Sequence, residues 1–262
     1  METADSMNIT CCQLDIAWED RPANFATVRR MLEAARPPAG SLVVLPEMFS
    51  TGFSMNIPRI HDGRKQTREF LAQIAIEFGV DILAGLVTCA PDSRGQNIAV
   101  LIDREGKQAG RYQKIHPFTP GGESAVYEPG RDVITWDDGS GWVICPFICY
   151  DLRFPETFRD AVRAGANLFV VIANWPAARE HHWVTLLMAR AIENQAYVVG
   201  VNRCGSDPKL AYRGRSMIID PRGQIIADAG EEEGTIAASL DLPALQQYRK
   251  EFPAIADMRT LP

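Results

Sequence analysis

The segment WVICPFICYDLRFPETFRDAVRAGANLFVVIA, residues 142–173, indicates the fold class. It begins and ends with apolar runs of strand length, 142–148 and 168–173. Between them Pro155 starts an amphipathic stretch, 155–164, that predicts a helix, because proline is favoured at the first helical position. A strand, a helix and a second strand in this order are typical of an α/β protein built in layers.

The same alternation continues on both sides of this segment. We expect the remaining strands at 8–14, 42–45, 81–87, 97–102, 197–202, 216–219 and 224–227, and the remaining helices at 22–35, 64–78 and 180–195. The strand at 97–102 is followed by a turn at 103–106. No linker, repeat or low-complexity tract interrupts the order, so we expect a single domain over residues 1–262.

Composition excludes several classes of protein. The 262 residues are 46% hydrophobic and 23% charged, which favours a globular chain over a disordered or fibrous one. The net charge is −6 without a basic run, so we expect no nucleic-acid partner. No apolar stretch approaches the roughly 20 residues that span a bilayer. The first ten residues lack a basic segment followed by an apolar one, so we expect no secretion signal and a cytoplasmic protein.

Six cysteines are spread along the chain without a CxxC pair or a zinc-ligand spacing. We therefore expect neither a disulfide framework nor a metal site. Free cysteine is among the residue types most often buried, so a structural thiol is the ordinary interpretation for each of them.

Three polar residues follow apolar strands, where α/β folds place catalytic groups. Glu47 follows the run 42–46, Lys114 follows the hairpin, and Cys149 ends the run 143–149. Taken one at a time, each has an ordinary structural interpretation: Glu47 as an exposed loop glutamate, Lys114 as a surface lysine and Cys149 as a buried thiol. Cys149, however, lies at a strand-to-helix turn, the position of a nucleophile whose following backbone N–H faces a developing oxyanion. Cys145, inside the same run, fits a structural thiol better.

Three strings in order, LPEMF (45–49), YQKIHPF (112–118) and ICYDLRFPE (148–156), resemble the nitrilase superfamily of carbon–nitrogen hydrolases. Four more are similar to its omega-amidase branch, which deaminates 2-oxoglutaramate and related ω-amides: MFSTGFSM (48–55), ANWPAAR (173–179), MARAIENQAY (188–197) and NRCGSD (202–207).

The resemblance implies a Glu-Lys-Cys triad. Glu47 is then the general base, Lys114 the cation that stabilises the oxyanion, and Cys149 the nucleophile. A further glutamate of the family falls on Glu123, where it orients the lysine and the substrate, with Glu128 as the fallback.

The resemblance also implies the remaining parts of the site. The backbone N–H of Tyr150 is the second oxyanion donor, and Asn174 and Trp175 line the pocket. The pocket is expected to be small and aromatic, from Phe118, Tyr127 and Trp175. A keto-acid ω-amide carries a carboxylate, for which Arg179 is the candidate cation; a surface arginine is the alternative.

Neighbouring polar residues receive structural interpretations. We expect Asp151, Arg153 and Glu156 to hold the turn, His181 and His182 to cap a helix, and His116 to shape the pocket without a catalytic role.

The resemblance further implies a four-layer α-β-β-α sandwich that forms a homodimer or larger homo-oligomer, acts on a small amide and water, and needs no metal or organic cofactor. Three alternatives keep the thiol mechanism: a nitrilase, an N-carbamoyl amino-acid hydrolase and a short aliphatic amidase. A fourth is a catalytically silent binding protein of the same fold.

Overall fold

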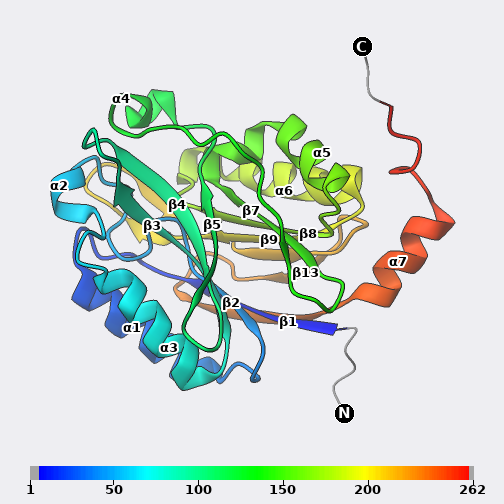
Figure 1. The fold of residues 1–262 in the computed structure, drawn as a ribbon, viewed down its shortest axis with the longest axis horizontal. Helices are drawn as coiled ribbons and strands as arrows, with labels where there is room; N and C mark the ends of the chain where they lie inside the picture. Colours follow the sequence, from blue (N-terminus) through cyan, green and yellow to red (C-terminus); the bar gives the residue numbers. More distant parts are fainter. Residues whose placement is uncertain (1–5, 260–262) are drawn as a thin grey trace.

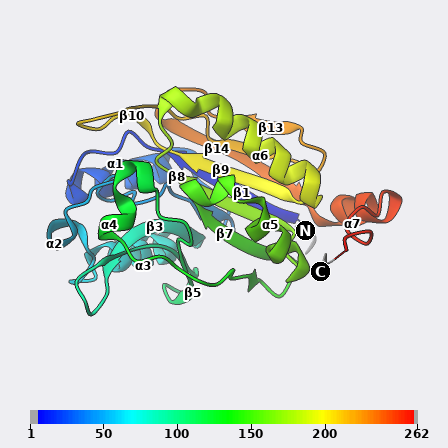
Figure 2. The same cartoon turned by 90° about the horizontal axis from the view of Figure 1, so that it is seen from above.

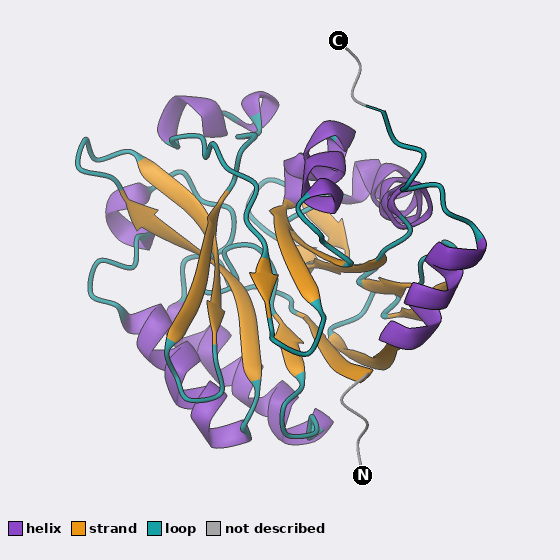
Figure 3. Cartoon of the chain, turned by 45° about the vertical axis from the view of Figure 1, so that its right-hand side comes forward, coloured by secondary structure: helices purple, strands orange, loops and turns teal. Residues whose placement is uncertain are grey.

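The computed structural model describes residues 6–259, in which two six-stranded sheets pack face to face with helices on both outer sides. Figure 1 shows α1 (Arg21–Ala35) and α3 (Gln66–Phe78) below one sheet, and α5 (Pro155–Arg163) and α6 (Glu180–Asn194) on the opposite side. Figure 3 shows the strands enclosed between these helical layers. The four-layer α-β-β-α sandwich is therefore confirmed.

The first sheet contains, in spatial order, β14 (Gly234–Asp241), β1 (Ser6–Gln13), β2 (Leu42–Val44), β3 (Asp81–Cys89), β4 (Gly95–Ile102) and β5 (Gln108–Gln113). Its centre, β1-β2-β3, is parallel, and α1 and α3 lie in the connections between these strands. The strands β14, β4 and β5 pair antiparallel at its sides.

The second sheet contains β13 (Ile225–Asp228), β12 (Met217–Ile219), β9 (Tyr197–Asn202), β8 (Leu168–Ala173), β7 (Val143–Ile148) and β6 (Trp136–Asp137). It repeats the plan of the first, with a parallel centre, β7-β8-β9, whose connections are α5 and α6. Figure 2 shows α6 lying over β9.

Side-chain alternation along the strands produces the layers. In β2, Leu42 and Val44 belong to the core between the two sheets, whereas Val43 packs with Val28 of α1 and Leu71 of α3. The parallel strand β8 is buried along its whole length, which explains its uninterrupted apolar sequence.

Smaller elements lie outside the two sheets. The strands β10 (Cys204–Ser206) and β11 (Ala211–Arg213) form a separate hairpin, and α7 (Leu242–Glu251) extends to one side of the molecule in Figure 1. Two one-turn helices, α2 (Ile57–Ile60) and α4 (Glu123–Val126), interrupt loops.

All the predicted strands and helices are present, with ends that differ by one or two residues. The sequence pattern gives no range for the strands β5, β6, β10, β11 and β14 or for the helices α2, α4 and α7. In β14 the core-facing Ile236, Ala238 and Leu240 are interrupted by the outward-facing Ala237, which is also apolar, so the alternation is weak. No helix among residues 6–259 is long and apolar enough to cross a membrane. Residues 1–5, which belong to the segment interpreted as lacking a secretion signal, lie outside the described residues.

Candidate active site

The predicted catalytic side chains follow strands of both sheets. Glu47 comes shortly after β2 and Lys114 directly after β5 in the first sheet. Cys149 and Asn174 directly follow β7 and β8 in the second sheet. The carboxyl ends of parallel strands are where α/β proteins collect ligand-binding groups. The site therefore forms only where the two sheets pack together.

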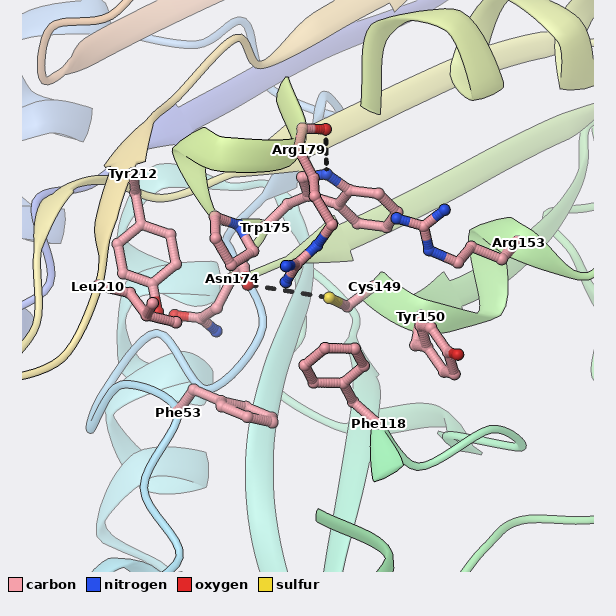
Figure 4. Close-up of a pocket in the computed structure, with 11 residues that line it drawn as sticks. Phe53, Phe118, Cys149, Tyr150, Arg153, Asn174, Trp175, Arg179, Leu210 and Tyr212 are labelled. Carbon is pink, nitrogen blue, oxygen red and sulfur yellow. Dashed lines mark hydrogen bonds between the residues drawn. The ribbon is translucent and has the colours of Figure 1, made fainter. Parts of the chain in front are cut away.

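A pocket opens beside Cys149. Figure 4 shows the Cys149 thiol facing Asn174, with Phe118 on one side and Arg179 on the other. The thiol lies 3.9 Å from the Asn174 carbonyl oxygen, to which it donates. The complete lining is Phe53, Phe118, Cys149, Tyr150, Arg153, Asn174, Trp175, Pro176, Arg179, Leu210 and Tyr212.

The backbone at Cys149 adopts a strained conformation. Its φ is 49°, in the left-handed region that non-glycine residues rarely adopt. A short 3₁₀ helix, Cys149–Arg153, begins there and leads to α5. Such strain persists only where the surroundings fix it, and it clusters at functional sites. Cys149 thus has the strand–turn–helix context expected from the sequence.

Asp151 fixes this turn, as predicted. Its buried carboxylate accepts hydrogen bonds from the Ile148 backbone N–H at 3.0 Å and the Tyr112 hydroxyl at 2.7 Å. It also accepts from the His116 backbone N–H at 2.9 Å, and the His116 ring lies against it and stacks on Phe154. His116 therefore supports the turn and does not line the pocket.

Glu47 is fully buried and tied to the second sheet. Its Oε2 accepts from the Asn174 backbone N–H at 2.8 Å, and its own carbonyl accepts from the Asn174 side chain at 2.7 Å. Since the Asn174 carbonyl accepts from the Cys149 thiol, one residue binds both the base candidate and the nucleophile candidate. This arrangement brings a carboxylate to the thiol.

Lys114 is buried between two carboxylates. Its Nζ donates to Glu47 Oε1 at 3.0 Å and to Glu123 Oε2 at 2.8 Å, and its side chain is 1% exposed. The Glu123 carboxylate also accepts from the Phe118 backbone N–H. An ammonium has three donors, so one N–H remains beyond these two ion pairs. The Nζ lies 5.4 Å from the ring of Phe53, so the cluster adjoins the pocket lining.

Burial and charge together set the protonation states. Burial would lower the pKa of Lys114, but Glu123 and Glu47 outweigh it and hold that pKa well above its ordinary value. Burial raises the pKa of Glu123. Burial, followed by the charge of Glu47, raises the pKa of Cys149 well above 9.0 against the opposing effect of Lys114. At neutral pH the lysine is charged and the thiol is protonated, so the thiol needs a base.

Cys145 differs sharply from Cys149. It lies inside β7, is fully buried and is absent from the pocket lining. Burial, with a contribution from Asp151, raises its pKa above the ordinary range. All six cysteines are free. Cys145 is thus the structural thiol and Cys149 the one that lines the pocket.

The glycine beneath Glu47 allows a first prediction. A Cβ on Gly85 of β3 would lie 2.6 Å from Glu47 Cα and 2.7 Å from the Met48 backbone nitrogen, closer than atoms approach. Because both neighbours are backbone, Gly85→Ala has to displace the Glu47 segment. We expect kcat to fall about 100-fold or more, as for small misplacements of catalytic groups. Gly234→Ala is the control, since a Cβ there meets open space; equal activity of the two variants would contradict this.

Several predicted residues occupy other places. Glu128, the fallback for Glu123, lies away from the cluster, with its carboxylate near Gln96 Nε2 at 3.4 Å. Tyr127 does not line the pocket, because it is buried and donates to the Ser54 carbonyl at 2.6 Å. Glu156 is exposed at the start of α5, so the prediction that it holds the turn is not supported.

The prediction that Arg153 serves the turn is wrong. Its guanidinium lines the pocket, 4.7 Å from the Trp175 ring. It also lies 3.1 Å from His182 Nδ1. Arginine only donates, so this histidine nitrogen accepts the hydrogen bond. The prediction that His181 and His182 cap α6 is wrong, because the helix start has no side-chain cap. His181 contacts Thr185 at 3.4 Å.

Arg179 lines the pocket, as the carboxylate hypothesis requires, and its guanidinium lies 5.3 Å from the Phe118 ring. Burial, and then the charge of Arg179, lowers the pKa of Arg153. The two guanidiniums are therefore close enough for their positive charges to repel each other. Neither has a carboxylate partner among residues 6–259, so the pocket carries uncompensated positive charge.

Five residues of the site escape the sequence reasoning. Asn97 contacts both carboxylates, and Phe53, Pro176, Leu210 and Tyr212 line the pocket. These four pocket residues come from loops and the outer hairpin, for which hydrophobic periodicity gives no signal. The sequence does contain a signal for Asn97, because it is a polar residue at the start of the apolar run 97–102. Within the described part of the chain, no group of three or more acidic, histidine or cysteine side chains is placed to hold a metal ion.

Comparisons with known proteins agree with this geometry. The sequence profile described as "Carbon-nitrogen hydrolase" matches residues 8–250. Omega-amidase YafV from Escherichia coli K12 is 39% identical over 255 residues, 96% of each chain. A 2-oxoglutaramate amidase from Bacillus subtilis is 36% identical over 258 residues, covering 96% of this chain and 97% of that one. The crystal structure of XC1258 from Xanthomonas campestris, a CN-hydrolase superfamily protein with an arsenic adduct in its active site, superposes with a TM-score of 0.91 at 33% identity and covers 98% of both chains.

Proposed function

The chain belongs to the carbon–nitrogen hydrolase family and is an amidase acting on C–N bonds, and we propose that it releases ammonia from the ω-amide of small keto-dicarboxylic acids through a thioester on Cys149. One observation carries the proposal. A strained, pocket-lining cysteine shares Asn174 with a buried Glu47, which is itself paired with a charged lysine.

Acylation uses the groups of both sheets. The Cys149 sulfur attacks the amide carbon while its proton moves to Glu47, because the thiol is protonated at neutral pH. The carbonyl oxygen becomes an oxyanion that the free N–H of Lys114 and the backbone N–H of Tyr150 stabilise. Glu47 then transfers its proton to the nitrogen, the C–N bond breaks, and ammonia leaves.

Deacylation reverses the role of Glu47. Its carboxylate takes a proton from water as the water oxygen attacks the thioester carbon. The same donors hold the second oxyanion, and its collapse breaks the C–S bond. The sulfur recovers the proton from Glu47, so the acid product leaves and the resting thiol is restored. Glu123 holds Lys114 in place during both steps.

The pocket supports a compact anionic substrate. Its walls are aromatic, and two arginines without carboxylate partners among the described residues, Arg153 and Arg179, face it. A guanidinium pairs with a carboxylate in two parallel hydrogen bonds. Relatives named omega-amidase and 2-oxoglutaramate amidase, which match nearly the whole chain, point to the same substrate class.

Ammonia release from a panel of compounds tests the proposal. The panel contains 2-oxoglutaramate, 2-oxosuccinamate, glutamine, propanamide and propionitrile. We expect the two keto-acid amides to give the highest kcat/KM. A higher value for propanamide or propionitrile would overturn the substrate class, and no turnover of any compound would overturn the amidase mechanism.

Arg179→Met provides the corresponding prediction on the substrate carboxylate. We expect KM for 2-oxoglutaramate to rise about 10- to 100-fold, since a hydrogen bond to a charged group contributes about 1.5–3 kcal/mol. The kcat/KM for propanamide should not change, because it has no carboxylate. Arg29→Met, on the outer surface of α1, is the control. An equal loss on both amides would show that Arg179 maintains the pocket rather than binding the carboxylate.

A further inference from the structure

Asn97 contacts both carboxylates of the cluster and the backbone of the lysine that lies between them. Its Nδ2 donates to Glu47 Oε1 at 2.7 Å and to Glu123 Oε1 at 2.9 Å. Its backbone carbonyl accepts from the Lys114 N–H at 2.9 Å. The side chain is 1% exposed. These contacts give Asn97 a place in the cluster that the mechanism above does not use.

The position of Asn97 in β4 explains how one residue contacts Glu47, Glu123 and the Lys114 backbone. Asn97 is opposite Val87 in the pairing of β4 with β3, and the next residue, Ile98, is opposite Gln113 of β5. The hydrogen bond from Lys114 to Asn97 extends the second pairing by one residue. The strand therefore sets the position of the lysine backbone and of the carboxylate-binding amide together.

An amide suits this position for an electrostatic reason. Glu47 and Glu123 share one lysine, so the buried cluster has an excess negative charge when both are ionised. An amide nitrogen has two N–H groups and gives one to each carboxylate, without adding a charge. The reverse orientation would set Oδ1 against two carboxylate oxygens, so hydrogen-bond chemistry assigns Nδ2 to them.

We propose that Asn97 is a positioning residue that holds Glu47 and Glu123 as carboxylates on either side of Lys114. This rests on the proposed role of Glu47 as the base. Hydrogen bonds to the ionised form of a carboxyl favour that form. The amide therefore acts in the same direction as Lys114 and the Phe118 N–H, and against the burial that raises the pKa of Glu123.

Three other titratable side chains lie near the Glu47 and Glu123 carboxyls. Lys114 follows β5, Cys149 follows β7, and Tyr127 follows α4. Burial, and then the charges of Glu123 and Glu47, raise the pKa of Tyr127 well above its ordinary value. Lys114 partly opposes this increase. Tyr127 and Cys149 are thus neutral in the acidic range and add no charge to the cluster there.

Asn97→Leu tests the proposal, because leucine has a similar size and no donor. Without the amide the carboxyls protonate more easily, so the acidic limb of kcat/KM should move to higher pH by about one unit or more. At a pH below that limb, activity falls about tenfold for each unit of the shift. KM for the amide on the alkaline side should change little, since Asn97 does not line the pocket.

Asn167→Leu is the matched control. Asn167 is also a buried asparagine, at the opposite end of β8 from Asn174, and it binds the Val143 N–H and the Gly141 carbonyl. We expect it to lower Tm and leave the pH profile unchanged. If Asn97→Leu also lowers Tm without moving the limb, Asn97 is structural only and the proposal is overturned.

Two further measurements complete the design. If Asn97→Leu does not fold, Asn97→Asp replaces it: the isosteric carboxylate removes the donors and adds a charge, so the limb should move further, and a wild-type profile would overturn the proposal. Alkylation of Cys149 by iodoacetamide, followed against pH, reports the same titration without turnover. A wild-type enzyme inactive on every amide but with a shifted alkylation profile in Asn97→Leu would refute the proposed function and leave the role of Asn97 standing.

Discussion

Replacing Cys149 by alanine lowers the turnover of 2-oxoglutaramate by at least about 10⁴-fold, whereas Cys145→Ala leaves it within about twofold. The reason is geometric. Cys149 lines the pocket and binds Asn174, while Cys145 is fully buried inside β7. Alanine at position 149 removes the atom that forms the thioester, and the remaining groups have no nucleophile to activate. Initial rates of ammonia release measure both variants.

Cys145→Ala is a demanding control because the two thiols are four residues apart in one strand and turn. Both substitutions delete a buried sulfur, so both should have similar, small effects on Tm. Comparable losses of turnover in the two variants would contradict the assignment, and so would a loss in Cys149→Ala of less than about 10²-fold.

Lys114→Met damages both stability and turnover. It leaves two buried carboxylates without a cation, which costs about 3–5 kcal/mol of unfolding free energy and lowers Tm on the order of 10 °C at neutral pH. Loss of an oxyanion donor reduces kcat about 10²- to 10³-fold. Thermal unfolding and initial rates measure the two effects separately.

The pH dependence of that loss identifies its cause. Without Lys114 the folded-state pKa of Glu123 lies further above its unfolded value than it does already. Such a carboxyl stabilises the fold below its unfolded pKa and loses that contribution as pH rises through the folded pKa. The Tm difference from wild type should therefore shrink as pH falls. Lys107→Met, at an exposed lysine in the β4–β5 turn, should change neither property. A pH-independent Tm loss in Lys114→Met would point to packing instead.

The sequence predicts the parts of this site in which a residue with a reactive or charged side chain follows a strand. Glu47 and Cys149 follow apolar strands with parallel neighbours, whose carboxyl ends lie together, whereas Lys114 follows the polar edge strand β5. Asn174 was expected only to line the pocket, whereas it also bonds Glu47 and Cys149. That finding depends on the packing of two sheets, which no single strand specifies.

The parts that the sequence does not reveal are those fixed by tertiary contacts. Arg153 resembles a turn residue until the structure sets it over Trp175. Leu210 and Tyr212 reach the pocket from a hairpin tethered by buried Arg203, which donates to the Asp15 carboxylate at 3.0 Å and lies over the Tyr212 ring. Such contacts join segments distant in sequence, so local pattern and spacing do not predict them.

The central claim is that Cys149 carries the acyl group, and mass spectrometry of the acid-quenched enzyme tests it most directly. Trypsin leaves Cys145 and Cys149 in one peptide, residues 132–153, so the Cys145→Ala variant is used to make the site unambiguous. With 2-oxoglutaramate in excess, the account predicts that this peptide gains the mass of the 2-oxoglutaryl group and that hydroxylamine removes it. An unmodified peptide during steady turnover, or an adduct on another residue, would contradict the account.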